Sequence, residues 1–423
     1  MKIVHLSTKD CSGAGISALR LHEGLKAAGI ESRMLVMDKS SEDPAVVRYD
    51  AGPRFLCRLA EKARAAARAM LRQRRADTGK SRAYDIFTLP YSCNSISRHP
   101  LVISADILTL RWVAGMIDYR EFFTGISKKP VVWRISDMNP FTGGCHYSGG
   151  CPRYRDSCGK CPAIGSVSEK DVSKTVFALK KECYKSANLT VAAPSKWLAR
   201  RAAESSLLKG VPVSVIPNGL DEAVFRPREK HEARRGLGLP AQRPIVLFGA
   251  DYVTGRKGFD EAVKVMSILF KTPGNRDTLL VTFGPPQPMD NAPEDVRKNT
   301  VQLGYLKGEE ILSRVYSAAD VFIMSPREEA FGQTCIEAMA CGTPVAAFGS
   351  GGINDIVENG HNGLTAESGD AAGLAEKTGY LLAHEAEQSR MGLAARRTVL
   401  AKYTLKIQAE AYIRLYEKML GQG

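Results

Sequence analysis

The chain has 423 residues, of which 44% are hydrophobic and 25% charged, and its formal net charge at pH 7 is +14. This is the composition of a soluble globular protein, and no apolar run is long enough to cross a bilayer. The length exceeds what one hydrophobic core usually serves and predicts two domains of about 200 residues each. The opening "MKIVHLSTKDCSG" is typical of a first β-strand rather than a signal peptide, so we expect a cytoplasmic protein with reduced thiols.

Short apolar runs alternate with helical patterns in the first half of the chain. The glycine loop 11–17 follows the first run and opens a helix that ends at Gly29. Gly13 and Gly15 carry no Cβ atom, so this loop can pass close to a phosphate or an acceptor; a plain tight turn is the alternative. The predicted strands of this half are 2–7, 32–37, 105–113, 129–137, 188–195 and 211–219.

A strongly basic stretch interrupts this alternation between residues 54 and 82. It holds ten Lys or Arg residues against Glu61 and Asp77, and apolar residues recur in it at steps of three and four. The pattern predicts a basic amphipathic helix, which is typical of segments that lie on anionic membrane surfaces. A solvated helix or loop without a partner is the alternative, and nucleic acid is the lesser competitor for the charge.

The second half begins after a charged, proline-bearing stretch at 225–244. Helical patterns again separate apolar runs, and a final helix is expected at about 405–420. Strand–helix alternation in both halves predicts an α/β protein with two parallel, doubly wound sheets. The predicted strands of this half are 244–250, 278–284, 301–306, 320–326 and 343–349.

The segment "SPREEAFGQTCIEAMACGTPVAAF" at 325–348 carries the strongest chemical signal. Glu329 follows a strand, and ligands of open α/β sheets bind at the carboxyl ends of strands. A helix then begins with the amides of Gly332, Gln333 and Thr334, and the N-terminus of a helix is a common binding site for phosphate. Glu337 lies further along this small, apolar helix, where a buried carboxylate is costly without a ligand or partner. A carboxylate there can accept two hydrogen bonds from a diol such as a ribose.

With these residues the chain resembles family 4, or group 1, of the retaining GT-B glycosyltransferases. The run E-x-F-G-x-x-x-x-E-A-M-A-C-G-x-P-V at 329–345 carries the resemblance, with Phe331 inside it. Further similar segments cover nearly the whole chain: "APSKWLARR" (193–201), "VIPNGLDEAVF" (215–225), "GRKGFDEAV" (255–263) and "SGGINDIVENGHNGL" (350–364), the last resembling a glycine turn and helix.

The resemblance implies a role for each residue of the second half. Glu337 would hold the ribose hydroxyls of a nucleotide-diphosphate sugar, and Glu329 the hydroxyls of the donor sugar. Lys257, together with Arg256, would neutralise the leaving diphosphate, so positive charge would stand where negative charge develops. Relatives commonly place this arginine several residues before the lysine, whereas here the two are adjacent.

The stretch "VVWRISDMNPFTGGCHY" at 131–147 resembles a subgroup that assembles bacterial exopolysaccharide, colanic-acid-like polymers or O-antigen. That subgroup often has His-Asp where this chain has Ser136 and Asp137. Ser136 can form hydrogen bonds but does not titrate near neutral pH. Arg111 also replaces a common histidine. We expect Asp137 to line the cleft, with a capping aspartate as the alternative.

Four of the ten cysteines stand in one short window, at Cys145, Cys151, Cys158 and Cys161. In a reducing compartment such clustering favours a metal over disulfides, and four thiolates suit a structural zinc ion. His146 is a fifth candidate ligand. Four unliganded thiols in a glycine-rich loop are the alternative, because the first two spacings are irregular.

Together these patterns predict a cytoplasmic, membrane-peripheral GT-B enzyme whose two Rossmann-like domains face across a cleft. It would move a sugar from a nucleotide-diphosphate donor to a lipid-linked or growing oligosaccharide, with retention and without a catalytic metal. The expected parts are an acceptor domain at 1–220 with a cysteine-rich loop at 143–165, a donor domain at 221–404, and a helix at 405–423 that packs on the first domain.

Two other functions fit parts of the sequence. A nucleotide-sugar epimerase or phosphorylase on a similar fold would convert donor without an acceptor. A zinc-dependent nucleic-acid-binding protein would use the charge and the cysteines, but it leaves the segment around Glu329 unexplained and lacks interleaved aromatic residues. We therefore expect no nucleic acid partner.

Overall fold

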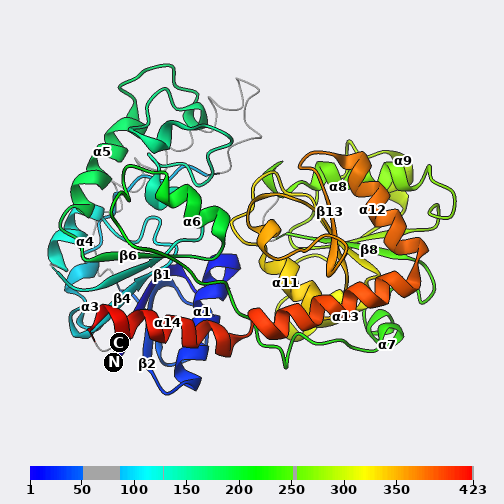
Figure 1. Ribbon diagram of the computed structural model, residues 1–423, viewed down its shortest axis with the longest axis horizontal. Coiled ribbons are helices and arrows are strands. Elements are labelled where there is room, and N and C mark those ends of the chain that lie inside the picture. Colours follow the sequence, from blue (N-terminus) through cyan, green and yellow to red (C-terminus); the bar gives the residue numbers. More distant parts are fainter. Residues whose placement is uncertain (51–85, 127, 251–254, 422–423) are drawn as a thin grey trace. The chain divides into compact units, whose positions relative to one another are not determined.

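The computed structural model describes residues 1–50, 86–126, 128–250 and 255–421 (Figure 1). The predicted basic helix at 54–82 lies outside the described residues. The chain forms two compact units: unit 1 comprises Met1–Ile216 and Gln408–Gly423, and unit 2 comprises Pro217–Ile407. The chain therefore passes from one unit to the other twice. Among the described helices, none has both the length and the apolar character needed to cross a membrane.

Unit 1 is built on a seven-stranded sheet in the order β3-β2-β1-β4-β5-β6-β7, with parallel pairing between all neighbours. Its strands are β1 (Lys2–Lys9), β2 (Glu31–Asp38), β3 (Val46–Arg48), β4 (Ile107–Leu110), β5 (Val131–Arg134), β6 (Leu189–Ala193) and β7 (Val213–Val215). Its helices include α1 (Ser12–Ala27), α3 (Pro100–Ser104), α4 (Tyr119–Gly125), α5 (Val172–Tyr184) and α6 (Lys196–Ala203).

The last helix, α14 (Leu405–Met419), completes the core of unit 1 although it follows unit 2 in sequence. Its buried residues Tyr412 and Tyr416 pack with Leu21 and Leu25 of α1 and with Ile107 of the sheet. Figure 1 shows α14 in red beside α1 in blue. The tyrosine hydroxyl of Tyr416 also lies 3.0 Å from Thr109 Oγ1 in β4, so the helix is tied to the sheet by polar as well as apolar contacts.

Unit 2 is built on a six-stranded sheet in the order β10-β9-β8-β11-β12-β13, and its neighbours are again parallel. Its strands are β8 (Ile245–Gly249), β9 (Leu279–Phe283), β10 (Thr300–Gln302), β11 (Val321–Met324), β12 (Val345–Phe348) and β13 (Gly363–Ala366). Its helices are α7 (Lys230–Gly236), α8 (Phe259–Leu269), α9 (Glu294–Lys298), α10 (Glu309–Ala318), α11 (Gln333–Ala340), α12 (Ala371–Ala383) and α13 (Glu385–Lys402), as far as the described residues go.

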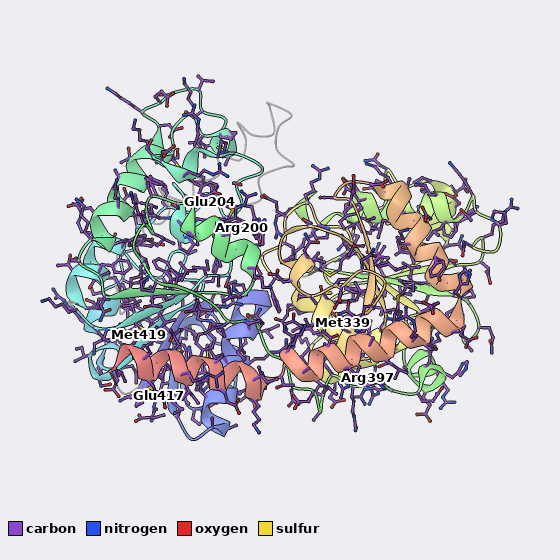
Figure 2. All side chains as sticks on the ribbon, in the orientation of Figure 1. Arg200, Glu204, Met339, Arg397, Glu417 and Met419 are labelled. Carbon is purple, nitrogen blue, oxygen red and sulfur yellow. The ribbon has the colours of Figure 1, made fainter. Side chains whose placement is uncertain are left out.

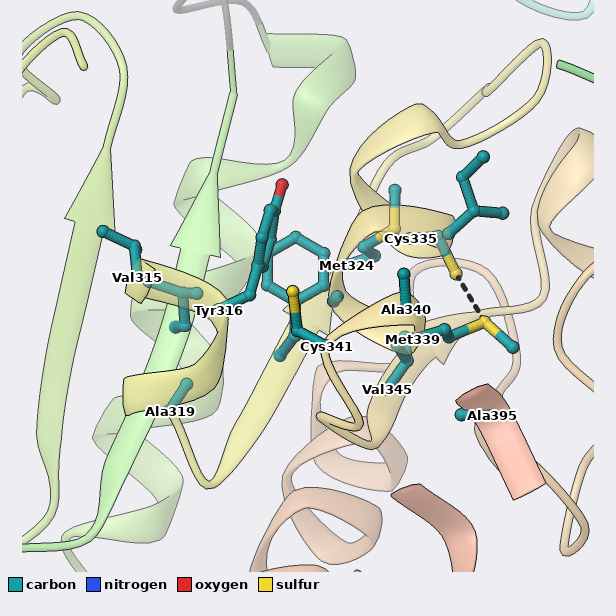
Figure 3. Close-up of a cluster of buried hydrophobic side chains, with 14 of the residues drawn as sticks. Val315, Tyr316, Ala319, Met324, Cys335, Met339, Ala340, Cys341, Val345 and Ala395 are labelled. Carbon is teal, nitrogen blue, oxygen red and sulfur yellow. Dashed lines mark hydrogen bonds between the residues drawn. The ribbon is translucent and has the colours of Figure 1, made fainter. Parts of the chain in front are cut away.

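Both faces of the second sheet are buried, as parallel strands between two helical layers require. Along β11, Phe322 and Met324 point into one hydrophobic cluster, whereas Val321 and Ile323 point into the other. Figure 3 shows the first of these clusters, in which side chains of α11 pack toward Tyr316 of α10 and toward α13. Helix α11, whose N-terminus is the predicted phosphate-binding site, is therefore held rigidly by apolar contacts on several sides.

The prediction of two doubly wound α/β sheets is confirmed. In each sheet the strand order reverses between two neighbours, β1 and β4 in unit 1 and β8 and β11 in unit 2. Ligands of such sheets bind outside the carboxyl ends of the strands at this point. The segment 350–364, which resembles a glycine turn and helix, contains a short 3-10 helix, Gly351–Asp355, and then enters β13. Its glycines are needed for close packing, as described below.

Candidate functional site

Lys257 and Glu329 meet at the switch point of unit 2. Lys257 ends a 3-10 helix that follows β8, and Glu329 lies in the loop that follows β11. The Lys257 ammonium nitrogen lies 2.8 Å from Glu329 Oε2. Arg256 Nη1 lies 3.7 Å from the same oxygen and donates a hydrogen bond to the backbone carbonyl of Glu328. Two cations and one carboxylate are thus gathered where the fold binds ligands.

Glycines allow the loops to close around this group. Gly258 follows Lys257 with a φ of +78°, and a Cβ atom added to it would lie 1.8 Å from the carbonyl oxygen of Ser325. The Ser325 hydroxyl donates a hydrogen bond of 2.7 Å to the Gly258 carbonyl. On the other side, a Cβ atom on Gly351 would lie 2.1 Å from the Glu329 carbonyl oxygen. Larger residues at these glycines would push the loops apart.

The carboxyl group of Glu329 is buried but remains charged. Burial by itself raises the pKa of this carboxyl. The positive charges of Lys257 and Arg256, and hydrogen bonds from Lys257 and the Phe331 amide, outweigh burial and hold the pKa below its usual value. An ionised Glu329 can accept hydrogen bonds from sugar hydroxyls. It also keeps both cations in place, so it contributes to the site even without touching a ligand.

Helix α11 begins a few residues after Glu329. Gly332 precedes the helix with a φ of +110°, and no side chain caps the first turn. The first-turn residues are Gln333 and Thr334, and the Gln333 side-chain oxygen accepts a hydrogen bond of 3.0 Å from Asn218 Nδ2. Unsatisfied amides at a helix start attract anions, and the nearby lysine and arginine add formal positive charge. The group is suited to a phosphate or diphosphate.

Glu337, predicted to hold a ribose, lies one turn into α11 and is buried. Its Oε2 accepts a hydrogen bond of 2.9 Å from the hydroxyl of Tyr316 on α10, a fully buried side chain. This partner was not predicted, because a single tyrosine in a helical pattern carries no sequence signal. Tyr316 fixes the orientation of the Glu337 carboxylate.

The glycine loop predicted at 11–17 is wrong in its conformation: helix α1 already begins at Ser12, so Gly13 and Gly15 lie at the start of this helix, after β1. A Cβ atom on Gly15 would lie 2.7 Å from the Asp10 carbonyl carbon, whereas one on Gly13 would meet no atom within 4 Å. Gly15 is therefore required by packing. Arg111 follows β4, the neighbouring strand, and its Nη2 donates to Ser17 Oγ in α1 at 3.1 Å. Burial lowers the pKa of this guanidinium, although Tyr412 and Tyr416 act in the opposite direction.

Asp137, after β5, pairs with a histidine rather than pointing to an open face. Its Oδ2 lies 2.6 Å from His146 Nδ1, and its Oδ1 accepts a hydrogen bond of 2.8 Å from the Asn139 amide. The other ring nitrogen of His146 lies 2.8 Å from Thr88 Oγ1. Burial raises the pKa of the Asp137 carboxyl, but His146 and the Asn139 amide outweigh burial and lower it. Asp137 thus anchors the loop that carries His146, and its contact with a sugar stays a prediction.

Ser136 lies beside this pair and accepts a hydrogen bond of 2.6 Å from Arg134 Nη1. The predicted site residues therefore form two groups. In unit 2, Lys257, Arg256, Glu329 and the start of α11 meet directly. In unit 1, Ser136 and Asp137 are neighbours after β5, and Gly13 and Gly15 lie at the start of helix α1, which follows β1. The roles assigned to these residues remain predictions.

The four cysteines of the window line a single cavity. Each is a free thiol, and no set of three or more His, Cys, Asp or Glu side chains in the described residues is arranged as metal ligands would be. His146 does not line this cavity but pairs with Asp137, so its prediction as a fifth ligand is not supported by the geometry. Zinc at this place stays a prediction.

Comparison with known proteins finds a family match for part of the chain. Residues 229–398 match the family model described as "Glycosyl transferases group 1". This segment contains Lys257, Glu329 and Glu337, so the candidate site of unit 2 lies inside the matched region. Within residues 229–398 the chain is thus similar to group 1 of the glycosyltransferases, as the sequence motif indicated, and the subgroup remains a prediction.

Curated and solved relatives agree with this result. A "D-inositol 3-phosphate glycosyltransferase" of Acidothermus cellulolyticus is 35% identical over 181 residues, which are 40% of this chain and 40% of that protein. The chain thus matches less than half the length of this relative.

The solved sucrose-phosphate synthase of Thermosynechococcus elongatus is 20% identical with a TM-score of 0.66, and each chain is covered in full. Anabaena HepE, solved in complex with UDP and glucose, is 15% identical with a TM-score of 0.63, covering 99% of this chain and 100% of that one. These two structures show the fold alone.

Proposed function

We propose that the protein is a glycosyltransferase that moves a sugar from a nucleotide-diphosphate sugar to an acceptor hydroxyl. The observation that carries this proposal is the group formed by Lys257, Arg256 and Glu329 beside the start of α11. It combines positive charge for a diphosphate with a carboxylate for sugar hydroxyls, at the strand ends where the fold binds ligands. The family match of residues 229–398 supports the same activity.

Each part of the donor has a matching group in unit 2. The diphosphate would lie against Lys257, Arg256 and the first amides of α11, where charge developing on the leaving group is stabilised. The sugar hydroxyls would bind Glu329. The ribose would bind Glu337, whose carboxylate Tyr316 orients. Nothing in this arrangement requires a catalytic metal ion, because the cations of the chain itself face the diphosphate.

Transfer would retain the anomeric configuration, as the resemblance to family 4 implies. The leaving diphosphate would depart on the face that the acceptor hydroxyl attacks and would help to remove its proton. Of the site carboxylates that lie in the described residues, Glu329 is ion-paired with Lys257 and Glu337 accepts a hydrogen bond from Tyr316, so neither is placed as a free nucleophile.

For the acceptor we propose a lipid-linked or growing oligosaccharide of bacterial surface polysaccharide synthesis. The resemblance of residues 131–147 to the exopolysaccharide subgroup supports this choice. The basic stretch 54–82 would hold the enzyme on the cytoplasmic face of the membrane, near such an acceptor. The name of the curated relative favours inositol phosphate as a second candidate acceptor.

A binding experiment tests the donor part of this proposal. The thermal midpoint of the purified chain is measured with UDP-, GDP- and dTDP-sugars, because a ligand bound only by the folded state raises it. We expect one nucleotide to raise the midpoint of the native chain and of Lys264→Ala, a change at an exposed lysine of α8, but not of Lys257→Ala. Equal shifts in both variants would refute the assignment of the diphosphate to Lys257.

A transfer experiment separates the two acceptors. The matched donor, labelled in its sugar, is incubated with the enzyme and either a bacterial lipid extract or inositol 3-phosphate. Label in the lipid fraction supports the oligosaccharide acceptor, and label on inositol phosphate supports the second candidate. Conversion of the donor with neither acceptor present would instead indicate an epimerase or phosphorylase.

A further inference from the structure

The cysteine-rich loop of unit 1 lines a very small cavity. Cys145, Cys151, Cys158 and Cys161 all line it, although up to sixteen positions separate them in sequence. Its volume is about 20 Å³, which is room for a single water-sized sphere. A guest of that size is one ion or one water molecule, and thiols are poor hydrogen-bonding partners for water.

The backbone between the last two cysteines is forced into an unfavourable conformation. Cys158, Gly159 and Lys160 have φ values of +53°, +106° and +41°, and two of these residues are not glycine. Such conformations cost on the order of 1 kcal/mol each and persist where the surroundings demand them. Here they turn the chain so that Cys158 and Cys161 face the same cavity.

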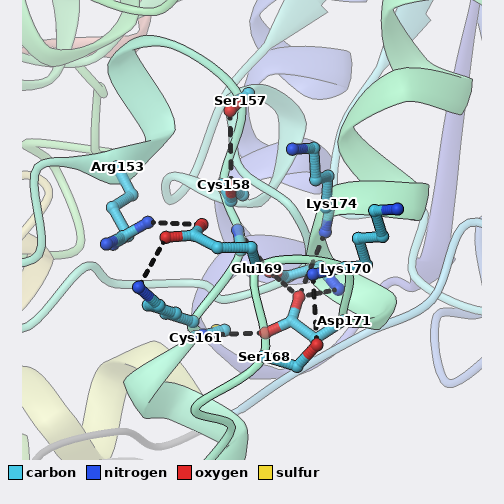
Figure 4. Close-up of polar contacts among 12 residues, drawn as sticks. Arg153, Ser157, Cys158, Cys161, Ser168, Glu169, Lys170, Asp171 and Lys174 are labelled. Atoms are coloured by element: carbon cyan, nitrogen blue, oxygen red, sulfur yellow. Dashed lines mark hydrogen bonds and ion pairs between the residues drawn. The ribbon is translucent and has the colours of Figure 1, made fainter.

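Polar contacts hold this turn from outside. Glu169 forms ion pairs with Arg153 at 3.1 Å and with Lys160 at 2.8 Å, and Asp171 accepts a hydrogen bond of 2.8 Å from the Cys161 amide (Figure 4). At the far end of the loop, Arg155 pairs with Glu204, which Figure 2 labels beside α6. The cavity is thus framed by contacts that do not involve the thiols.

Two groups around the cavity are suited to negatively charged sulfur. The amide of Gly143 donates a hydrogen bond of 3.2 Å to Cys158 Sγ. Lys180 of α5 is fully buried, and its ammonium group donates to the carbonyl oxygens of Asn139 and Thr142. Within the described residues Lys180 forms no direct ion pair with a carboxylate, and its positive charge interacts with Cys145, Cys158 and Asp137.

We propose that these four cysteines bind one zinc ion as thiolates and that Lys180 offsets part of the charge of the site. Binding releases four thiol protons to solvent and forms four Zn–S bonds, so the site carries a net charge of −2. Two disulfides would also join the four sulfurs, but they are neutral, so they would place no negative charge beside Lys180 and would leave Asp137 as its countercharge. The buried lysine therefore favours the metal.

The thiols line the cavity without yet converging on one point. Rotation of each Cys side chain about its χ1 bond moves the sulfur without moving the backbone, so the ion can draw the four sulfurs to about 2.3 Å. The site is structural, because all four positions are taken by the protein. Because Cys145 is adjacent to His146 in sequence, the site supports the loop that Asp137 and His146 anchor.

Metal content and a cobalt spectrum test the proposal. The full chain is purified without a histidine tag, its zinc is measured by mass spectrometry, and Co²⁺ is then added to metal-free protein. We expect about one zinc per chain and the intense visible bands of tetrahedral cobalt bound by sulfur. The double variant Cys158→Ser, Cys161→Ser should lose both, whereas Cys183→Ser should keep both, because Cys183 is a buried cysteine of α5 outside the cavity lining.

Measurements on the unmutated chain decide whether the four cysteines bind zinc even if the double variant does not fold. Native protein without zinc and without a cobalt band would overturn the proposal. So would alkylation in denaturant without reductant that leaves four of the ten cysteines unlabelled, since that result means two disulfides. Lys180→Met should weaken zinc binding by about tenfold, as loss of a supporting group around a metal does, and an unchanged affinity would contradict the role of the lysine.

Discussion

The ammonium group of Lys257 lies 2.8 Å from Glu329 Oε2, although 72 positions separate the two residues in sequence. They are brought together because β8 and β11 are neighbours at the point where the strand order of unit 2 reverses. The ion pair keeps Glu329 charged and keeps Lys257 aimed at the region in front of α11. A donor diphosphate would compete for the lysine, so the pair is a site prepared for an anion.

We expect Glu329→Gln to lower the rate of sugar transfer by about 10²–10³-fold, the effect of losing one polar group that acts in the transition state. The amide is nearly isosteric, but it cannot accept hydrogen bonds as a carboxylate does, and it does not fix Lys257. Binding of the nucleotide diphosphate should persist, because both cations remain. Steady-state kinetics and nucleotide affinity check this. A rate within threefold of the native enzyme would contradict the assignment.

Tyr316→Phe should destabilise unit 2 by about 1–3 kcal/mol, since it leaves the buried carboxylate of Glu337 without one of its donors. We expect the same variant to weaken nucleotide binding, because the carboxylate is no longer oriented. The matched control is Tyr380→Phe, a tyrosine that is 41% exposed on α12. Urea unfolding and nucleotide titration measure the two effects, and equal losses in both variants would count against an orienting role for Tyr316.

Gly258→Ala should destabilise the protein far more than Gly274→Ala. Both glycines have positive φ values, +78° and +84°, so both substitutions incur the backbone cost of about 1–2 kcal/mol. Only the Cβ atom at Gly258 would collide with the Ser325 carbonyl, whereas Gly274 has no atom within 4 Å. Overpacking adds about 1–3 kcal/mol. Comparison of the urea midpoints tests whether the loops after β8 and β11 are packed as described.

Stability of unit 1 should fall as the pH drops from about 6.5 to about 4. Burial lowers the pKa of His22 to about 4, with Asp43 opposing the shift, and it also lowers the pKa of His5 well below its usual value. The unfolded chain therefore binds protons on these side chains at a pH where the folded chain does not. The loss of stability is complete below the folded-state pKa values and absent above about pH 6.5, and for His22 it amounts to roughly 3 kcal/mol.

His22→Gln should flatten this dependence between pH 6.5 and 4.5, because a titrating group is removed. His361→Gln, a change at an exposed histidine of unit 2, serves as the control and should leave the dependence as it is. Thermal midpoints recorded across this pH range check the prediction. A slope in His22→Gln equal to that of the native protein would show that His22 does not titrate as described.

The alternation of apolar runs and helical patterns was enough to predict both sheets, because parallel strands buried on two faces are continuous apolar runs. Glu329 and the start of α11 could be placed at a strand end for the same reason. The edge strands β3 and β13 were missed. β3 has only three residues, and β13 is a four-residue strand, Gly363–Ala366, that begins with a glycine.

The partners of the site residues could not be predicted from sequence. Tyr316 and Glu337 lie on different helices, and only the packing of α10 against α11 joins them. Asp137 and His146 are nine residues apart in a loop without periodicity, so their hydrogen bond depends on a chain path that no local rule specifies. The same holds for Lys180, whose apolar helix pattern gave no sign that its ammonium group is buried near two cysteines.

The most direct test of the central claim is a transfer assay with labelled nucleotide sugar, a bacterial lipid extract as acceptor, and analysis of the product anomer by NMR. The account predicts acceptor-dependent transfer with retained configuration, abolished in Lys257→Ala and normal in Lys264→Ala. Turnover that needs no acceptor, or that survives in Lys257→Ala at the native rate, would contradict it.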